Sequence, residues 1–146
     1  MAMELFIAQI AATLVMAGVI WFVQVVHYPL FARVGSSEFA AYEAEHTTRT
    51  GWVVGPPMLV EIATATLALV PGLRPEFFPP WAAVAGEALV GVIWISTAAL
   101  QVPLHGRLVA GFDTRMAGRL VSSNWVRTVG WSLRAALLLW VVARVL

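Results

Sequence analysis

The chain has 146 residues, of which 60% are hydrophobic and 12% are charged, and its formal net charge is +1. A soluble domain carries about 25% charged residues, so this composition excludes an ordinary soluble domain and indicates an integral membrane protein. The small net charge gives no support for nucleic-acid binding. The absence of cysteine excludes disulfide bonds, thiolate metal ligands and a thiol nucleophile.

Four apolar segments are long enough to cross a bilayer, which takes about 20 helical residues. They cover residues 5–26, 52–70, 81–102 and 124–146. We therefore expect a single all-α membrane domain, residues 1–146, folded as a four-helix bundle with the lipid bilayer around it. Because little chain lies outside these segments, any functional site has to be built inside the bundle or at its ends.

The distribution of arginine predicts the orientation of the bundle. The stretches after the first and third apolar segments, with their flanks, carry Arg33, Arg49, Arg107, Arg115, Arg119 and Arg127. The opposite side has Arg74 and Arg144. Basic residues concentrate on the cytoplasmic side of membrane proteins. This bias predicts a multi-pass protein of the bacterial inner membrane with both termini outside.

The longest polar stretch, residues 36–50, precedes the second apolar segment. Its larger side chains recur at helical spacing, namely Phe39, Tyr42, His46 and Arg49. This spacing predicts an additional amphipathic helix. The chain then runs through Gly55, Pro56 and Pro57, and prolines interrupt the backbone hydrogen bonds of a helix. We therefore expect the helix that leads into the second membrane segment to be kinked or broken.

The two halves of the chain share a short pattern. The matched strings are Gln24-Val25-Val26-His27-Tyr28-Pro29-Leu30 with Gln101-Val102-Pro103-Leu104-His105, and His46-x-x-Arg49-Thr50 with Asn124-x-x-Arg127-Thr128. Because the first and third segments cross the membrane in the same direction, the pattern predicts a parallel internal repeat of two helical hairpins. The strings are short, so a chance match is the alternative.

All three histidines, His27, His46 and His105, lie at the expected cytoplasmic ends of the helices. Imidazole is a common ligand of iron, copper and zinc, and two histidines suffice for haem. The sequence therefore predicts a transition-metal or haem site held by these histidines. No pair shows a close ligand motif such as H-x-x-x-H. The alternative is that each histidine lies at the lipid headgroups and hydrogen bonds to a loop.

Polar side chains near these histidines in the sequence complete the candidate site. We expect Arg127 and Asn124 to act on a substrate that enters from the lipid. The side chains expected to contact the cofactor are Arg49, Gln24, Gln101 and Arg134.

Glu61 and Arg134 are charged residues inside apolar segments. A charge near the bilayer centre costs about 2.5 kcal/mol or more and needs a partner. At 1.5 Å per residue, Glu61 lies about 13 Å and Arg134 about 6 Å from the cytoplasmic ends of their segments. The length of the arginine side chain lets the two form a buried ion pair. The alternative is that Glu61 is catalytic, as a proton relay or a substrate contact.

Five strings spread over nearly the whole chain carry a family resemblance. They are Gln24-x-x-x-Tyr28-Pro29-x-Phe31, Phe39-x-x-x-x-x-x-His46-x-x-Arg49, Pro57-Met58-x-x-Glu61-x-x-Thr64, Ser96-Thr97-x-x-x-Gln101-x-Pro103-x-His105 and Asn124-Trp125-x-Arg127-Thr128-x-x-Trp131-x-x-Arg134. With them the chain resembles a widespread, uncharacterised group of small bacterial four-helix membrane proteins. The last string and the four-segment layout also resemble the anthrone-oxygenase-like membrane proteins and small haem-binding proteins of protoporphyrinogen oxidation. The haem proteins have a histidine inside their first span, which residues 5–26 lack.

Two functional hypotheses follow. The first is a membrane-embedded metal- or haem-dependent oxidoreductase that acts on a small or lipophilic substrate near the cytoplasmic face. The second is a transporter or channel for a small solute, an ion or a proton, in which Glu61 binds the transported species. Four helices are too few for a pore inside one subunit, so the second hypothesis requires a homo-oligomer. A membrane subunit that only binds a partner protein is a third alternative.

The predicted topology is testable by single-cysteine labelling, because the chain has no cysteine of its own. We expect a cysteine at Ser36 to react with a membrane-impermeant reagent only from the cytoplasmic side, and a cysteine at Arg74 only from the outside. Intact and permeabilised cells distinguish the two sides. Labelling of both positions from the same side would contradict the four-segment topology.

Overall fold

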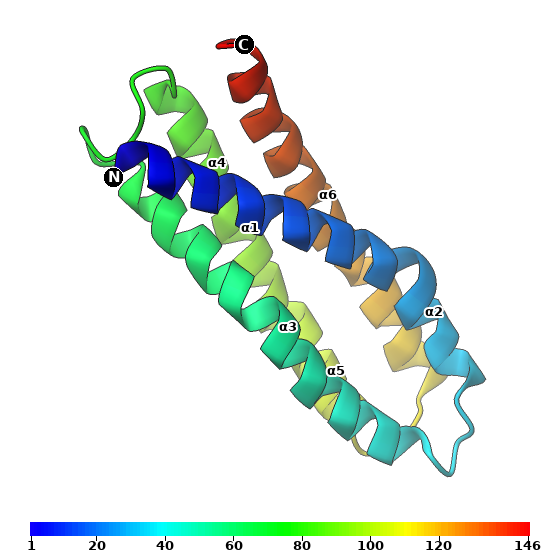
Figure 1. Ribbon diagram of the computed structural model, residues 1–146. Coiled ribbons are helices and arrows are strands. Elements are labelled where there is room, and N and C mark those ends of the chain that lie inside the picture. Colours follow the sequence, from blue (N-terminus) through cyan, green and yellow to red (C-terminus); the bar gives the residue numbers. More distant parts are fainter.

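The computed structural model describes all 146 residues and contains helices without strands (Figure 1). The first half is built from α1 (Ala2–Phe22), a π-helical segment (Val23–His27), α2 (Tyr28–Leu30), a short 3-10 turn (Phe31–Arg33) and α3 (Phe39–Leu67). The second half is built from α4 (Pro80–Ser96), a second π-helical segment (Thr97–Gln101), α5 (Val102–Leu108) and α6 (Thr114–Ala143). The all-α fold expected from the sequence is therefore confirmed.

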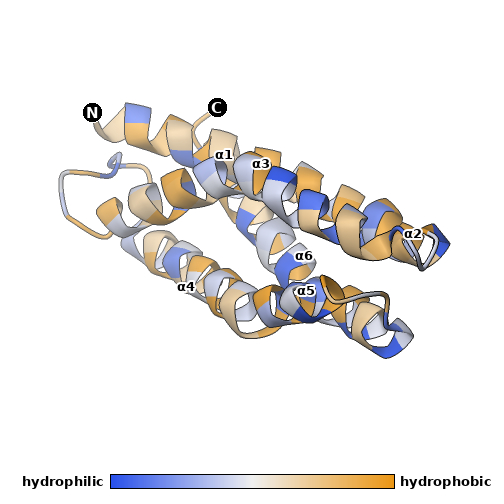
Figure 2. Cartoon of the chain, turned by 90° about the horizontal axis from the view of Figure 1, so that it is seen from below, coloured by the Kyte–Doolittle hydropathy of each residue, from blue (hydrophilic) through white to orange (hydrophobic).

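The long helices lie side by side, with α1 against α3 and α6, and α4 against α6. Both termini lie at one end of the bundle, and α2 lies at the other end together with the start of α3 and the end of α5 (Figure 1). We call this second end the distal end. Hydrophilic residues gather there, whereas hydrophobic residues cover most of the remaining length (Figure 2).

Three continuous helical stretches are long and apolar enough to cross a membrane: Ala2–Arg33, Pro80–Leu108 and Thr114–Ala143. Large apolar side chains such as Trp52 and Ile95 are exposed on the outside of the bundle, while 13 of the 39 buried residues are polar or charged. An apolar exterior around a polar interior is the pattern of a bundle that faces lipid. These observations agree with the expected membrane location.

Residues 39–50 are helical as expected, but the expectation that they form an additional helix was wrong, as was the expected break at Gly55–Pro57. One continuous helix, α3, runs from Phe39 to Leu67 through both prolines. Each proline removes a single backbone hydrogen bond on a partly or fully exposed turn, while the remaining helical bonds on either side are retained. Membrane helices tolerate prolines in this way, because leaving the helix would free many more backbone groups.

Two π-helical segments, Val23–His27 and Thr97–Gln101, each end two residues before a proline, Pro29 and Pro103. A proline ring crowds the preceding helical turn and leaves one carbonyl without its usual donor, and a wider π turn accommodates both effects. The buried amides of Gln24 and Gln101 lie in these segments. Gln24 accepts a hydrogen bond from Asn124 (2.9 Å) and Gln101 donates one to Ser123 (3.1 Å), so both π segments are attached to α6.

A fully buried ion pair joins α3 to α6 in the middle of the bundle. Nε of Arg134 donates to Oε1 of Glu61 at 2.8 Å, and both side chains are at most 1% exposed. Oε1 also accepts from Thr13 of α1 (2.6 Å), and Oε2 accepts from the indole of Trp131 (2.8 Å). Nη1 of Arg134 donates to the carbonyl of Gly86 in α4 (2.6 Å). The cluster therefore connects α1, α3, α4 and α6.

The residue type at Gly86 follows from this cluster. A Cβ atom at that position would lie 2.8 Å from Nη1 of Arg134, which is closer than van der Waals contact allows. Glycine lets the guanidinium approach the backbone of α4 and reach its carbonyl. Glycine at this position therefore lets the backbone of α4 bind the buried guanidinium of Arg134, which lipid could not solvate.

We expect Arg134→Met to lower the free energy of unfolding by about 3–5 kcal/mol, because it leaves the carboxylate of Glu61 buried without a cation. The double variant Glu61→Gln/Arg134→Met should recover part of that loss, since no unpaired charge remains. Reversible unfolding in detergent micelles measures both effects. The exposed pair of Glu45 and Arg49 (3.0 Å) is the control, and its removal should cost less than about 1 kcal/mol. Equal losses for the two pairs would contradict this role.

Candidate metal centre

The three histidines meet at the distal end of the bundle although they come from different helical segments. His27 ends the first π-helical segment, His46 lies in α3 and His105 lies in α5. Nε2 of His27 is 2.9 Å from Nδ1 of His46, and the ring centroids of His46 and His105 are 5.4 Å apart. The three imidazoles therefore form one cluster, as the metal hypothesis requires.

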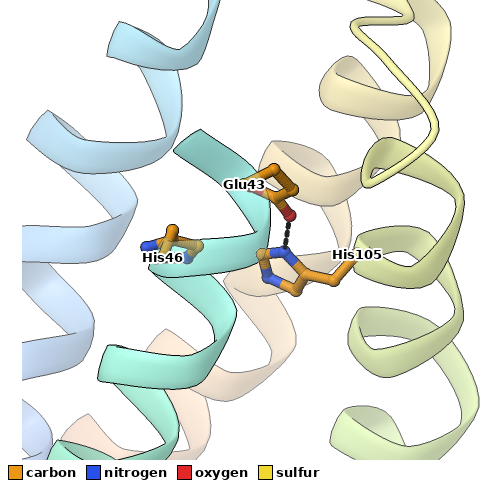
Figure 3. Close-up of side chains that lie close together, drawn as sticks. All are labelled: Glu43, His46 and His105. Atoms are coloured by element: carbon orange, nitrogen blue, oxygen red, sulfur yellow. Dashed lines mark hydrogen bonds and ion pairs between the residues drawn. The ribbon is translucent and has the colours of Figure 1, made fainter. Parts of the chain in front are cut away.

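A carboxylate completes this cluster. Glu43 lies one helical turn before His46 in α3, and its side chain is fully buried. Oε1 of Glu43 is 2.5 Å from Nδ1 of His105, and Oε2 is buried without a hydrogen-bond partner (Figure 3). One donor atom each from Glu43, His46 and His105 lies within 4.8 Å of the others. A buried carboxylate oxygen without a partner is costly, and a cation at this point would compensate it.

Aromatic and hydroxyl groups hold the imidazole rings in place. The phenol of Tyr28 hydrogen bonds to Nε2 of His105 at 2.9 Å, and the hydroxyl of Thr50 lies 3.1 Å from Nδ1 of His46. Phe31, which is 1% exposed, packs edge-on against the ring of His46 with a centroid distance of 5.2 Å. A set of rings fixed by such contacts is preorganised for a ligand.

Two cavities flank His46. One, of about 320 Å³, lies between α3 and α5 and is lined by His46, His105, Tyr28 and Arg127. The other, of about 450 Å³, lies between α1 and α3 and is lined by His27, His46 and Arg49. Arg127 is 7% exposed, and its guanidinium carbon lies 5.3 Å from the ring centroid of Trp131, so the first cavity is bordered by a buried cation.

The protonation of His46 suits metal binding. His46 precedes the apolar part of α3, and burial lowers its pKa from the ordinary value of 6.5 to about 4. Burial is the largest cause of this shift, and the neighbouring His27 and His105 contribute the rest, because a second positive charge beside theirs is unfavourable. The imidazole is therefore neutral at pH 7 and keeps a lone pair for a metal ion.

Two histidines and one carboxylate are a recurrent metal-binding set. It occurs in non-haem iron oxygenases, where open positions remain for the reactants, and in catalytic zinc sites with a bound water. The sequence signal for Glu43 is the Glu43-x-x-His46 spacing, which places both side chains on one helical face. Sequence reasoning missed this signal because it looked for two histidines at close spacing.

The other sequence-predicted residues divide into two groups. Arg127 lies at the histidine cluster. Arg49 lines the cavity between α1 and α3, and it also forms an ion pair with Glu45 on the surface. Gln101 lines the cavity between α3 and α5 and is hydrogen bonded to Ser123. The other three side chains, Gln24, Asn124 and Arg134, bind other parts of the bundle away from the cluster. Because α3 is continuous, Glu61 lies about 22 Å along the helix from His46 and does not contribute to the same site.

Comparison of the chain with protein-family models, with curated proteins and with solved structures gives no match. The residues of the site and their geometry are therefore the basis for a functional argument. That basis consists of one carboxylate, three imidazoles, a buried guanidinium and two adjoining cavities.

The lowered pKa of His46 predicts how the stability of the metal-free protein depends on pH. Above about pH 6.5 this imidazole is neutral in the folded and unfolded chains, so it contributes no pH dependence. Between about pH 6.5 and about pH 4 the unfolded chain takes up a proton that the folded chain excludes, and stability falls. Thermal unfolding over this range should show a weaker decrease for His46→Asn than for the wild type. Identical pH profiles for the two proteins would contradict the lowered pKa.

Proposed function

We propose that the chain is a membrane-embedded oxidoreductase that uses a single transition-metal ion held by Glu43, His46 and His105. The observation that carries this proposal is the unpartnered, buried oxygen of Glu43 beside two imidazoles. The resemblance to the anthrone-oxygenase-like membrane proteins points to the same reaction class. The expected metal is iron, because two histidines and a carboxylate are the ligand set of non-haem iron oxygenases.

Other metals and haem have less support. Zinc and copper also accept imidazole ligands, but copper sites favour more nitrogen or sulfur donors than this one offers. For haem, a histidine would have to face a porphyrin plane. Here the ring centroid of His46 lies 4.5 Å from that of His27 and 5.4 Å from that of His105, so the imidazoles pack against one another.

The cavity between α3 and α5 is the proposed substrate site. It adjoins His46 and His105 and is bordered by apolar residues such as Val54 and Val102. Val102 is 61% exposed on the outer surface of the bundle, where lipid would lie. The guanidinium of Arg127, which lines the cavity, would bind an oxygen atom of the substrate. A small lipophilic molecule with one polar oxygen, entering from the membrane, fits this lining.

A bound iron ion would supply the site where dioxygen, the expected oxidant, and the substrate meet. The residues of the chain supply proton transfer. Tyr28, His105 and Glu43 form a hydrogen-bonded chain that starts at the cavity, since the phenol contacts Nε2 and the carboxylate contacts Nδ1 of His105. With Nδ1 of His105 and the carboxylate of Glu43 holding the metal, the remaining Nε2–H of His105 would donate to the phenol oxygen of Tyr28, and the O–H of Tyr28 would be the proton donor for a substrate oxygen in the cavity.

This proposal includes a four-span topology, with the site at the cytoplasmic face of the bacterial inner membrane and both termini outside. The apolar part of α3, from Trp52 to Leu67, would be the fourth span, and its packing against α1 supports this. The arginine bias described above supports the orientation. The two π-helical segments, each two residues before a proline, support a parallel repeat of two hairpins.

The transport hypothesis has less support from the geometry of Glu61. Its two carboxylate oxygens accept hydrogen bonds from Thr13, Trp131 and Arg134, and the side chain is 1% exposed. A carboxylate that binds and releases an ion or a proton needs a free acceptor and a route to water. The saturated surroundings of Glu61 favour a structural role, and a homo-oligomeric pore would leave this carboxylate equally enclosed.

We expect the purified protein to retain about one transition-metal ion per chain, and Glu43→Gln, His46→Ala and His105→Ala each to reduce it to background. Inductively coupled plasma mass spectrometry of protein from cells supplied with iron, copper and zinc measures the content and the preferred metal. Glu45→Gln is the matched control, because Glu45 is in the same helix but its side chain is 70% exposed and paired with Arg49.

Full metal content in all three variants, with unchanged thermal unfolding, would overturn the proposed site. The same conclusion would follow if the wild-type protein bound no metal under any supply. Tyr28→Phe separates the two roles in the proposal: this variant should keep its metal, because the phenol is not a ligand, and lose the phenolic proton donor of the cavity.

A further inference from the structure

A third cavity, separate from the metal centre, lies at the distal end between α5 and the start of α6. Its volume is about 780 Å³. Three arginines line it: Arg107 of α5, and Arg115 and Arg119 of α6. None of the three forms an ion pair. Their positive charges are therefore gathered in one groove without carboxylate partners.

The nearest acidic residue in the sequence is already in use. Asp113 caps the N-terminus of α6, where its carboxylate accepts a hydrogen bond from the backbone N–H of Met116 at 2.7 Å. It is not among the residues that line the cavity, and no other acidic residue lines it. Arg107 makes only a long contact of 4.0 Å with the sulfur of Met116. The guanidinium groups are thus free to bind an anion from outside the chain.

The rest of the lining is apolar on one side and contains small residues on the other. It consists of Ala99, Leu100, Pro103 and Leu104 on one side, and of Gly118 with two serines on the other. Leu100 precedes Arg107 by seven helical residues, so the apolar wall begins about 10 Å farther into the bundle than the arginines. Leu100 is 42% exposed, so this wall is open to the surroundings of the bundle. The groove is cationic at its outer end and apolar toward the membrane interior.

We infer that this groove binds one anionic phospholipid, with its phosphate at the arginines and an acyl chain along Leu100. Guanidinium groups bind phosphate through short, charge-assisted hydrogen bonds. Basic pockets between membrane helices on the cytoplasmic side are sites for such headgroups. A free phosphate ion would satisfy the arginines but would leave the apolar wall uncovered, which favours the lipid. The inference is independent of the proposed metal chemistry.

The test uses the full-length protein in nanodiscs of phosphatidylcholine with and without phosphatidylglycerol. Native mass spectrometry counts the lipids that remain bound, and a titration gives the apparent affinity for phosphatidylglycerol. We expect one retained phosphatidylglycerol per chain, bound about fivefold more weakly by Arg115→Gln and by Arg119→Gln. Arg33→Gln is the matched control, because it removes an exposed arginine at the same end of the bundle but outside the groove.

Equal weakening by all three substitutions would overturn the inference, because it would reflect the general surface charge. Unchanged binding in Arg115→Gln and Arg119→Gln would also overturn it. A further titration with inorganic phosphate separates the two sources of the anion. If millimolar phosphate displaced the lipid and raised the unfolding temperature as much as the lipid does, the groove would be a soluble-anion site. Both arginines are exposed, so these variants should fold as the wild type does.

Discussion

The bundle depends on the ion pair between Glu61 and Arg134, because neither charge can remain inside an apolar bundle without the other. Its hydrogen bonds reach four helices and therefore fix how each is rotated about its own axis. Glu43 precedes Glu61 by 18 residues, which is about five full turns of a continuous helix. The rotation that turns Glu61 inward consequently turns Glu43 inward at the distal end, where it meets His105.

The same relation explains which parts of the site the sequence could predict. The charges at Glu61 and Arg134 stand out within apolar segments, so their pairing follows from the cost of an isolated charge. The predicted break at Pro56 and Pro57 prevented the count of turns from Glu61 back to Glu43. That count, together with the Glu43-x-x-His46 spacing, distinguishes Glu43 from the nearby Glu45, which the structure places on the exposed side of α3.

The amides were assigned to a cofactor for a different reason. Gln24, Gln101 and Asn124 are polar residues near the histidines in sequence, and polar residues inside a membrane protein suggest function. In the structure Gln24 accepts a hydrogen bond from Asn124 and Gln101 donates one to Ser123, so these amides connect the π-helical segments to α6. A single sequence gives the number of such groups but not their partners, since the partners lie about 20 to 100 residues away in the chain.

Each π-helical segment rotates the side chains that follow it about the helix axis, relative to the side chains that precede it. Each segment accommodates one residue more than a regular α-helical turn, and one residue corresponds to about 100° of rotation around an α-helix. His27 ends the first segment and His105 follows the second by four residues. The inserted residue changes the direction of both imidazoles relative to the lipid-facing pattern of the preceding span. Each of these two helices can thus turn one face toward lipid along the apolar span and a different face inward at the distal end, where the histidines meet.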